Sequence, residues 1–234
     1  MSEEQDIMDH LIAAIQAGQY EPEDKLLSEN DLAEQFRVPR ITARKAYERL
    51  QEMGYIYSKQ GRGSFVKDRH QRIPLLLSAS ESFSKKMLEL GYDYQSRNVF
   101  CEPIEYNRKI FKALGVEETD RVFKIGRLRM VSRQPIALHI SYVAEVLFQD
   151  IEQVGRDITS MYEFYKSRGF TELGGPAQTL LSISFPTKYE RSLLACSSLI
   201  PLLVLESACE DLRTGKTLEF TRTLYRGDYF TYEV

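Results

Sequence analysis

The segment from residue 28 to residue 66 constrains the fold most, because it reads as two helices, a tight turn between them and a β-hairpin. Ser28 is a favourable N-cap, and the apolar residues after it recur at helical spacing. The second helix is expected over residues 40–53 and stops at Gly54. Two short strands around a Gly-Arg-Gly turn complete the pattern. This order predicts a winged helix-turn-helix.

The charge distribution supports this prediction. Residues 1–36 carry ten acidic side chains and one base, Lys25, and are therefore strongly negative. Residues 37–72 carry ten Lys or Arg against three acids and are strongly positive, although the whole chain has a formal net charge of −3. The bases concentrate on the second helix of the motif and on the hairpin. A local basic face on a helix-turn-helix is typical of a DNA-binding protein.

Composition narrows the class of protein. The chain has 234 residues, enough for two modest cores, and no apolar run approaches the roughly 20 residues that a membrane span needs. Its acidic N-terminus does not resemble a signal peptide. The three cysteines lie far apart, which favours a reducing cytoplasm, and the three histidines lack the spacing of metal ligands. We therefore expect a cytoplasmic protein without a metal or cofactor.

A change of pattern divides the chain. We expect a DNA-binding domain over residues 1–68, a linker over 69–80 and a second domain over 81–234. A helix is also expected before the motif, at about residues 4–17. The second domain mixes hairpin-linked strands with short helices, which indicates an antiparallel α+β fold. Its expected helices are 82–90, 108–114, 159–168 and 188–194, and its expected strands begin at 97, 122, 136, 178, 202 and 217.

The recognition helix and the hairpin tip supply candidate DNA contacts. The N-terminal residues of a helix in the major groove meet base edges, and arginine there can bind guanine through two hydrogen bonds. An arginine at the hairpin tip suits the narrow minor groove. The candidate residues are Arg40, Thr42, Arg44, Lys45, Gly61, Arg62 and Gly63.

These residues carry a resemblance to a known family. The run LLSENDLAEQFRVPRITARKAYERLQEMGYIYSKQGRGSFV is similar to the DNA-binding domain of GntR-family regulators, whose pattern is LPSE, L-A, V-S-R-x-T-V-R, L and G-x-G-T-F-V. The likeness spans residues 7–66. Leu27 replaces a Pro, Ala43 a Val, and Pro39 the Ser that caps the recognition helix. Because Pro has no hydroxyl, that helix is expected to lack a side-chain cap.

The second domain contains polar groups that suit an anion. Strand alternation places Arg127 and Arg129 on one face of the strand that begins at Val122. Two arginines at this spacing repel each other unless an anion or a carboxylate lies between them. His139 and Ser141 share a face of the next strand, and the last strand groups Glu219, Thr221, Thr223 and Tyr225. Helix starts at Phe83–Ser84 and at Ser160–Tyr162 could add donors.

This domain resembles the UTRA effector domain of the HutC subfamily, through R-L-R, x-Q-P-I-A, T-S-M-Y and T-L-E-F-T-R-T-L-Y-R-G-D-Y-F. The likeness runs from about residue 80 and implies the chorismate-lyase fold used as a sensor. It also implies that a phosphate or another acid is held by Arg127, Arg129, Ser160, Tyr162 and the amides of Phe83 and Ser84. Glu219 and Tyr225 would contact the rest of the ligand. His139 stands where amino-sugar-phosphate sensors carry Glu, which leaves other sugar phosphates or a carboxylate open.

Together these features predict a bacterial repressor that binds a palindromic operator as a homodimer and is released by a small anion. Two alternatives remain. One is a lyase-like enzyme that uses Arg127, His139 and Glu219 as an acid–base set. The other is a nucleoid-type protein with a vestigial sensor, which would bind DNA without sequence preference.

Overall fold

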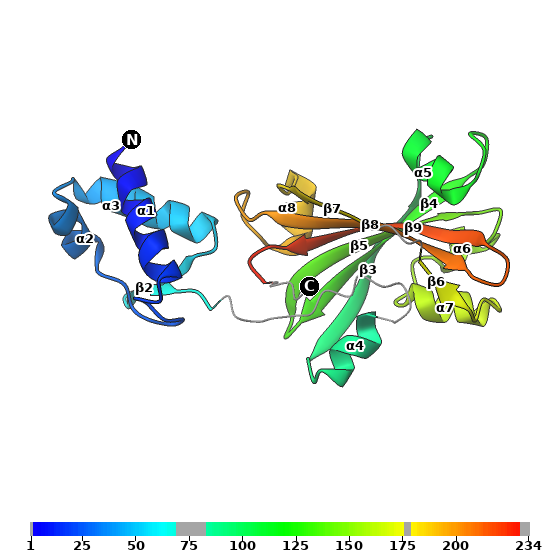
Figure 1. Cartoon of the computed structure of the whole chain (residues 1–234), viewed down its shortest axis with the longest axis horizontal. Helices are drawn as coiled ribbons and strands as arrows, with labels where there is room; N and C mark the ends of the chain where they lie inside the picture. Colours follow the sequence, from blue (N-terminus) through cyan, green and yellow to red (C-terminus); the bar gives the residue numbers. More distant parts are fainter. Residues whose placement is uncertain (1, 69–82, 176–178, 230–234) are drawn as a thin grey trace.

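The computed structural model describes residues 2–68, 83–175 and 179–229 (Figure 1). The predicted linker, 69–80, lies outside the described residues. Residue 82, where a helix was expected to begin, and residue 178, where a strand was expected to begin, also lie outside the described residues.

The N-terminal unit is the predicted winged helix-turn-helix. Its elements are α1 (Glu3–Gln16), α2 (Glu29–Phe36), α3 (Arg40–Glu52), β1 (Ile56–Lys59) and β2 (Gly63–Val66). The Ser28 hydroxyl accepts a hydrogen bond from the Asp31 amide and caps α2. No side chain caps α3, because Pro39 occupies the N-cap position. One apolar core joins the three helices to the hairpin, with Ile7, Leu32 and Leu50 almost fully buried.

The C-terminal unit is the predicted antiparallel α+β domain. Its helices are α4 (Phe83–Glu89), α5 (Arg108–Leu114), α6 (Ile151–Val154), α7 (Met161–Ser167) and α8 (Lys188–Leu194). Its strands are β3 (Tyr94–Pro103), β4 (Val122–Val131), β5 (Gln134–Ala144), β6 (Leu173–Gly174), β7 (Leu180–Ser184), β8 (Leu202–Asp211) and β9 (Lys216–Arg226).

These strands form one sheet in the order β3-β4-β5-β9-β8-β6. Strand β7 also pairs with β8, along the same edge of β8 as β6. Every pairing is antiparallel, as hairpin-linked strands predict. The register sets Arg127 opposite His139 on β4 and β5, and His139 opposite Thr223 on β9. Three neighbouring strands therefore present the predicted polar residues side by side.

Helices cover both faces of the sheet (Figure 1). On one face, α5 and α8 pack against alternate residues of the central strands, such as Leu138 and Leu224. On the other face, α7 packs over Phe123 and Ile125, while α4 packs over Ala137 and Tyr225. The polar residues lie between these two apolar clusters, on the same face of the sheet.

The structure agrees with most of the expected bounds to within two residues and differs by more in three places. Strand β3 begins at Tyr94 rather than residue 97, because it is an edge strand whose exposed polar side chains carry little apolar signal. Helix α6 and strand β6 were not expected at all. They contain 4 and 2 residues, which is too short for any periodicity to show.

Candidate functional site

The recognition helix α3 presents its basic residues to solvent. The side chains of Arg40 and Arg44 are 67% and 60% exposed, Lys45 is also exposed, and Thr42 is half-buried. The buried side of α3 carries Ala43, Ala46, Tyr47 and Leu50. The Tyr47 hydroxyl donates to the Leu27 carbonyl across 2.7 Å and ties α3 to the loop before α2.

Both helix arginines are already held by carboxylates. Arg40 lies 2.8 Å from Glu29 of α2, and Arg44 lies 2.8 Å from Glu48 one turn along α3. Exposed ion pairs of this kind contribute only about 0–1 kcal/mol. Both guanidinium groups can therefore exchange their carboxylates for DNA at small cost.

The hairpin tip has the geometry expected of a wing. Gly61 and Gly63 have φ values of +71° and +107°, a region that favours glycine. Between them Arg62 is exposed, and its amide donates to the Lys59 carbonyl to close the turn. The cleft between α3 and this tip is lined by Arg40 and Lys59, among others. The recognition helix and the wing thus border one basic surface.

The second candidate site is a buried polar array on β4, β5 and β9. It lies on the sheet face covered by α4 and α7. Its members are Arg127, Arg129, His139, Ser141, Glu219, Thr221, Thr223 and Tyr225. Arg127 and Arg129 are only 6% and 8% exposed, so they are not surface arginines.

Arg127 lies on β4, directly opposite His139 of β5. Its Nη2 donates to the Ser141 hydroxyl across 2.9 Å. Burial lowers the pKa of this guanidinium, Glu219 opposes the shift, and Arg129 adds to it. Within the described residues, three buried side-chain polar atoms have no hydrogen-bond partner: Arg127 Nε, Glu219 Oε2 and Tyr165 OH. Buried polar atoms are rarely left unsatisfied, so this region has spare capacity for a polar ligand.

Arg129 makes a different set of contacts. It donates from Nη2 to His139 Nδ1 across 3.0 Å and from Nη1 to the Tyr225 hydroxyl across 3.3 Å. Its guanidinium also lies 4.0 Å from the centre of the Phe83 ring. Burial and the charges of Arg129 and Arg127 hold the pKa of His139 well below its usual 6.5. The histidine is therefore neutral.

Not every predicted effector residue contacts the array. Phe83 does, whereas the Ser84 hydroxyl lies 3.5 Å from Tyr94. The Ser160 hydroxyl accepts from the Glu163 amide and caps α7. Tyr162 lies under Lys166 of its own helix, with 4.5 Å between ring centre and Nζ.

Tyr165 was not predicted as a site residue, yet it is only 1% exposed and lies beside the array. Burial together with the nearby Glu219 carboxylate raises the pKa of its phenol well above 10.0. Tyr162 and Tyr165 lie one turn apart on α7, and helical spacing alone does not say which of the two faces the sheet.

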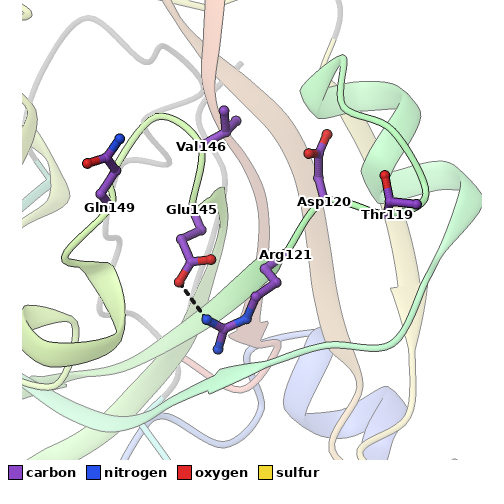
Figure 2. A pocket seen from close by; sticks show the side chains of 6 residues that line it. All are labelled: Thr119, Asp120, Arg121, Glu145, Val146 and Gln149. Atoms are coloured by element: carbon purple, nitrogen blue, oxygen red, sulfur yellow. Dashed lines mark hydrogen bonds and ion pairs between the residues drawn. The ribbon is translucent and has the colours of Figure 1, made fainter.

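A surface pocket lies elsewhere, where α5 leads into β4 and β5 ends. It is lined by Thr119, Asp120, Arg121, Glu145, Val146 and Gln149 (Figure 2). Arg121 is held there by Glu145 at 2.7 Å and by Glu152 at 3.1 Å. Its charge is thus already balanced by two carboxylates, which makes this pocket a poor site for an anion.

Among the described residues, His, Cys, Asp and Glu side chains form no group of three that could hold a metal ion. No described helix is long and apolar enough to cross a membrane.

Known proteins share both units of this chain. Residues 3–66 match the model of bacterial regulatory proteins of the gntR family, and residues 89–231 match the UTRA domain. The transcriptional repressor NagR of Bacillus subtilis is 27% identical over 226 residues, which is 97% of this chain and 91% of that protein. The mannosyl-D-glycerate transport/metabolism system repressor MngR of Escherichia coli is 27% identical over 227 residues, which is 97% of this chain and 92% of that protein.

The fold has also been seen in a crystal structure. PhnF from Mycobacterium smegmatis superposes with a TM-score of 0.61 at 22% identity, and 97% of each chain is covered. The family and its curated relatives are transcriptional regulators, which sets aside the lyase-like alternative. This chain belongs to the GntR family of bacterial transcriptional regulators, in the HutC-type branch that carries a UTRA effector domain.

Proposed function

We propose that this regulator is a cytoplasmic repressor that binds a palindromic operator as a homodimer and releases it when a small anion binds the UTRA domain. The domains proposed for these two tasks are residues 1–68 and 81–234. The single observation that carries the anionic effector is the buried pair Arg127 and Arg129, whose charges exceed the single carboxylate of Glu219 in the polar array. Buried charges are costly unless they are paired.

The groups around this pair favour a phosphorylated sugar or an organic acid. His139 is neutral and uses Nδ1 as an acceptor, so the positive charge available to a bound anion comes from the two arginines. Thr221, Thr223 and Tyr225 supply hydroxyls, which suit a ligand that carries hydroxyl groups of its own. The MngR relative is named for mannosyl-D-glycerate, a sugar derivative with a carboxylate.

For DNA binding, we propose that Arg40 and Arg44 read base edges in the major groove and Arg62 enters the minor groove. The exposure of all three arginines and the weak ion pairs of Arg40 and Arg44 support this role. Gly61 and Gly63 shape the turn that presents Arg62, and Thr42 and Lys45 are placed to contact phosphate or bases. Phosphate contacts position a protein on DNA, whereas base contacts specify the sequence.

The homodimer is proposed to form through β7. In the described residues this strand pairs on one side only, with β8. Leu180, Leu181 and Ile183 are 59%, 55% and 74% exposed, and Phe185 follows at 64%. An open, apolar strand edge readily pairs with a second copy. A two-fold axis through two such strands would also supply the symmetry that a palindromic operator requires.

The test is binding of the purified chain to a library of genomic fragments, repeated with phosphorylated sugars and organic acids. We expect to recover one palindromic site, and we expect one anion to release the protein from it. If the protein binds a selective site and no anion releases it, the proposed effector class is wrong. Binding to all fragments alike would favour the nucleoid-type alternative.

A further inference from the structure

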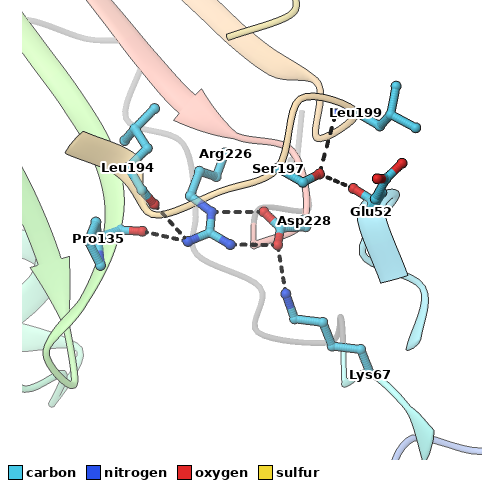
Figure 3. A network of polar contacts seen from close by, with 8 residues as sticks. All are labelled: Glu52, Lys67, Pro135, Leu194, Ser197, Leu199, Arg226 and Asp228. Carbon is cyan, nitrogen blue, oxygen red and sulfur yellow. Dashed lines mark hydrogen bonds and ion pairs between the residues drawn. The ribbon is translucent and has the colours of Figure 1, made fainter. Parts of the chain in front are cut away.

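A polar cluster outside both candidate sites joins the two units (Figure 3). Lys67 lies directly after the wing strand β2, and its Nζ is 2.7 Å from Oδ2 of Asp228. Asp228 belongs to the C-terminal unit and follows β9 by two residues. Its side chain is 1% exposed and that of Lys67 is 27% exposed, so water screens this ion pair only partly.

Arg226, the last residue of β9, holds Asp228 in place. Its Nε and Nη2 donate to the two carboxylate oxygens at 3.0 and 2.8 Å, which is the bidentate geometry of a strong pair. Its Nη1 donates to the carbonyls of Leu194 and Pro135. Burial raises the pKa of Asp228, but the hydrogen bonds and charges of Arg226 and Lys67 outweigh this effect and lower the pKa overall. Asp228 is therefore a fixed negative charge that faces the winged helix-turn-helix.

A second contact supports the first. The Ser197 hydroxyl donates to the Glu52 carbonyl at the end of the recognition helix α3. Next to it, Gly54 lies so close to the C-terminal unit that a Cβ there would be 2.8 Å from Cδ1 of Ile200 and 3.2 Å from Cβ of Asp228. The C-terminal end of α3 thus contacts the loop before β8. The residue that follows the wing contacts Asp228, just after β9.

We propose that Lys67, Asp228 and Arg226 form an interdomain latch, which sets the orientation of the winged helix-turn-helix on the UTRA domain. Strand β9 connects this latch to the polar array. Tyr225 accepts a hydrogen bond from Arg129, and the next residue along the strand is Arg226. A ligand that moves Arg129 or Tyr225 acts one residue away from the guanidinium that holds Asp228. The effect of the latch on DNA binding rests on the proposed function. The existence of the latch does not depend on it.

Two variants break the latch with opposite changes of charge. Lys67→Met removes a positive charge and leaves Asp228 paired with Arg226, so the UTRA domain keeps its internal contacts. Asp228→Asn removes a negative charge and leaves Lys67 in place. The matched controls are Lys109→Met and Glu206→Gln, because these residues form a 2.5 Å ion pair within the C-terminal unit and change the charge equally.

The first measurement is amide hydrogen exchange of the full chain without DNA or effector. The latch predicts that Lys67→Met and Asp228→Asn each raise exchange about tenfold or more in two separated segments, 52–54 and 197–200, while the controls do not. Unchanged exchange in both segments would overturn the latch, whatever the outcome of the operator experiment.

The second measurement is the affinity of the same four variants for the recovered operator. If the latch sets orientation, both latch variants shift the affinity in the same direction, by about threefold or more. The alternative is that operator affinity falls when a positive charge is removed and rises when a negative charge is removed, in the latch variants and the controls alike. That pattern would show that Lys67 and Asp228 act on DNA only through electrostatics. That result would overturn the regulatory part of the proposal.

Discussion

Arg129 donates a hydrogen bond to Nδ1 of His139, and this contact fixes the tautomer of the histidine. Arginine carries only donors, so Nδ1 must be an acceptor and the remaining proton sits on Nε2. The Thr223 hydroxyl also lies 2.7 Å from Nδ1. A protonated His139 would place a third positive charge beside Arg127 and Arg129. The polar array is therefore built for a neutral histidine.

This arrangement predicts how stability depends on pH. Well above pH 6.5, His139 is neutral in both the folded and the unfolded chain, so its contribution is constant. Below pH 6.5 the unfolded chain binds a proton that the folded chain excludes, because the folded pKa is lowered. The free energy of unfolding should then fall by up to about 1.4 kcal/mol per pH unit from this residue alone. Urea unfolding between pH 7.5 and 5.5 measures the slope.

The variant His139→Asn should remove this part of the slope, because the Asn carbonyl can accept from Arg129 but does not titrate. His10→Asn is the control, since His10 is an exposed residue of the other unit. Equal slopes for the wild type and His139→Asn would contradict the assignment of a neutral His139.

The attraction between the buried charges of Arg127 and Glu219 predicts a non-additive effect on stability. Arg127→Met leaves the Glu219 carboxylate buried without this compensating charge, and an uncompensated buried charge costs up to about 3–5 kcal/mol. Arg127→Met combined with Glu219→Gln removes both charges and should recover most of that loss. Circular dichroism during urea unfolding measures both variants. A double variant as unstable as the sum of the two single variants would show that the charges act independently.

The same residue should separate sensing from DNA binding. Arg127→Ala, in conditions where the variant stays folded, is expected to abolish release of the operator by the anion and to leave operator affinity unchanged, since Arg127 lies in the other unit from the DNA surface. Arg127→Lys keeps the charge and tests whether geometry matters as well. Release at the wild-type anion concentration in Arg127→Ala would place the effector site elsewhere.

The recognition helix offers a matched pair of arginines. Arg44→Ala should cost about 1–3 kcal/mol in operator binding and relax specificity at one base pair. Arg49→Ala is the control, because Arg49 lies on the same helix near its other end and is likewise paired with a carboxylate, that of Glu52. Gel shifts with the operator and with a scrambled duplex measure both. An equal loss on the two duplexes would assign Arg44 to phosphate.

The sequence predicted the winged helix-turn-helix closely, because its signals are local. The Ser28 cap, the positive-φ Gly54 and the glycines of the wing each act within a few residues. The absence of a cap on α3 could likewise be predicted from Pro39 alone. Strand alternation predicted which residues of β4, β5 and β9 share a face, because alternation depends only on the backbone of each strand.

Contacts between distant segments could not be predicted in this way. Tyr165 faces the polar array because of the angle at which α7 packs on the sheet, and no spacing within α7 encodes that angle. The link between Lys67 and Asp228 joins residues 161 positions apart. It depends on how two separately folded units meet, which neither periodicity nor capping reports.

The edge strand β7 leads to a prediction about assembly. Ile183→Lys places a charge at the most exposed apolar position of the strand, where a second copy would have to desolvate it, so the homodimer should dissociate at concentrations at which the wild type remains paired. Val146→Lys is the control, because Val146 is 62% exposed but follows β5 at the opposite end of the sheet. Sedimentation velocity over a concentration series measures the assembly state, and a dimer that survives Ile183→Lys unchanged would exclude β7 as its interface. Because two half-sites are bound together, the Ile183→Lys monomer should also lose most of its operator affinity while its affinity for a single half-site stays the same.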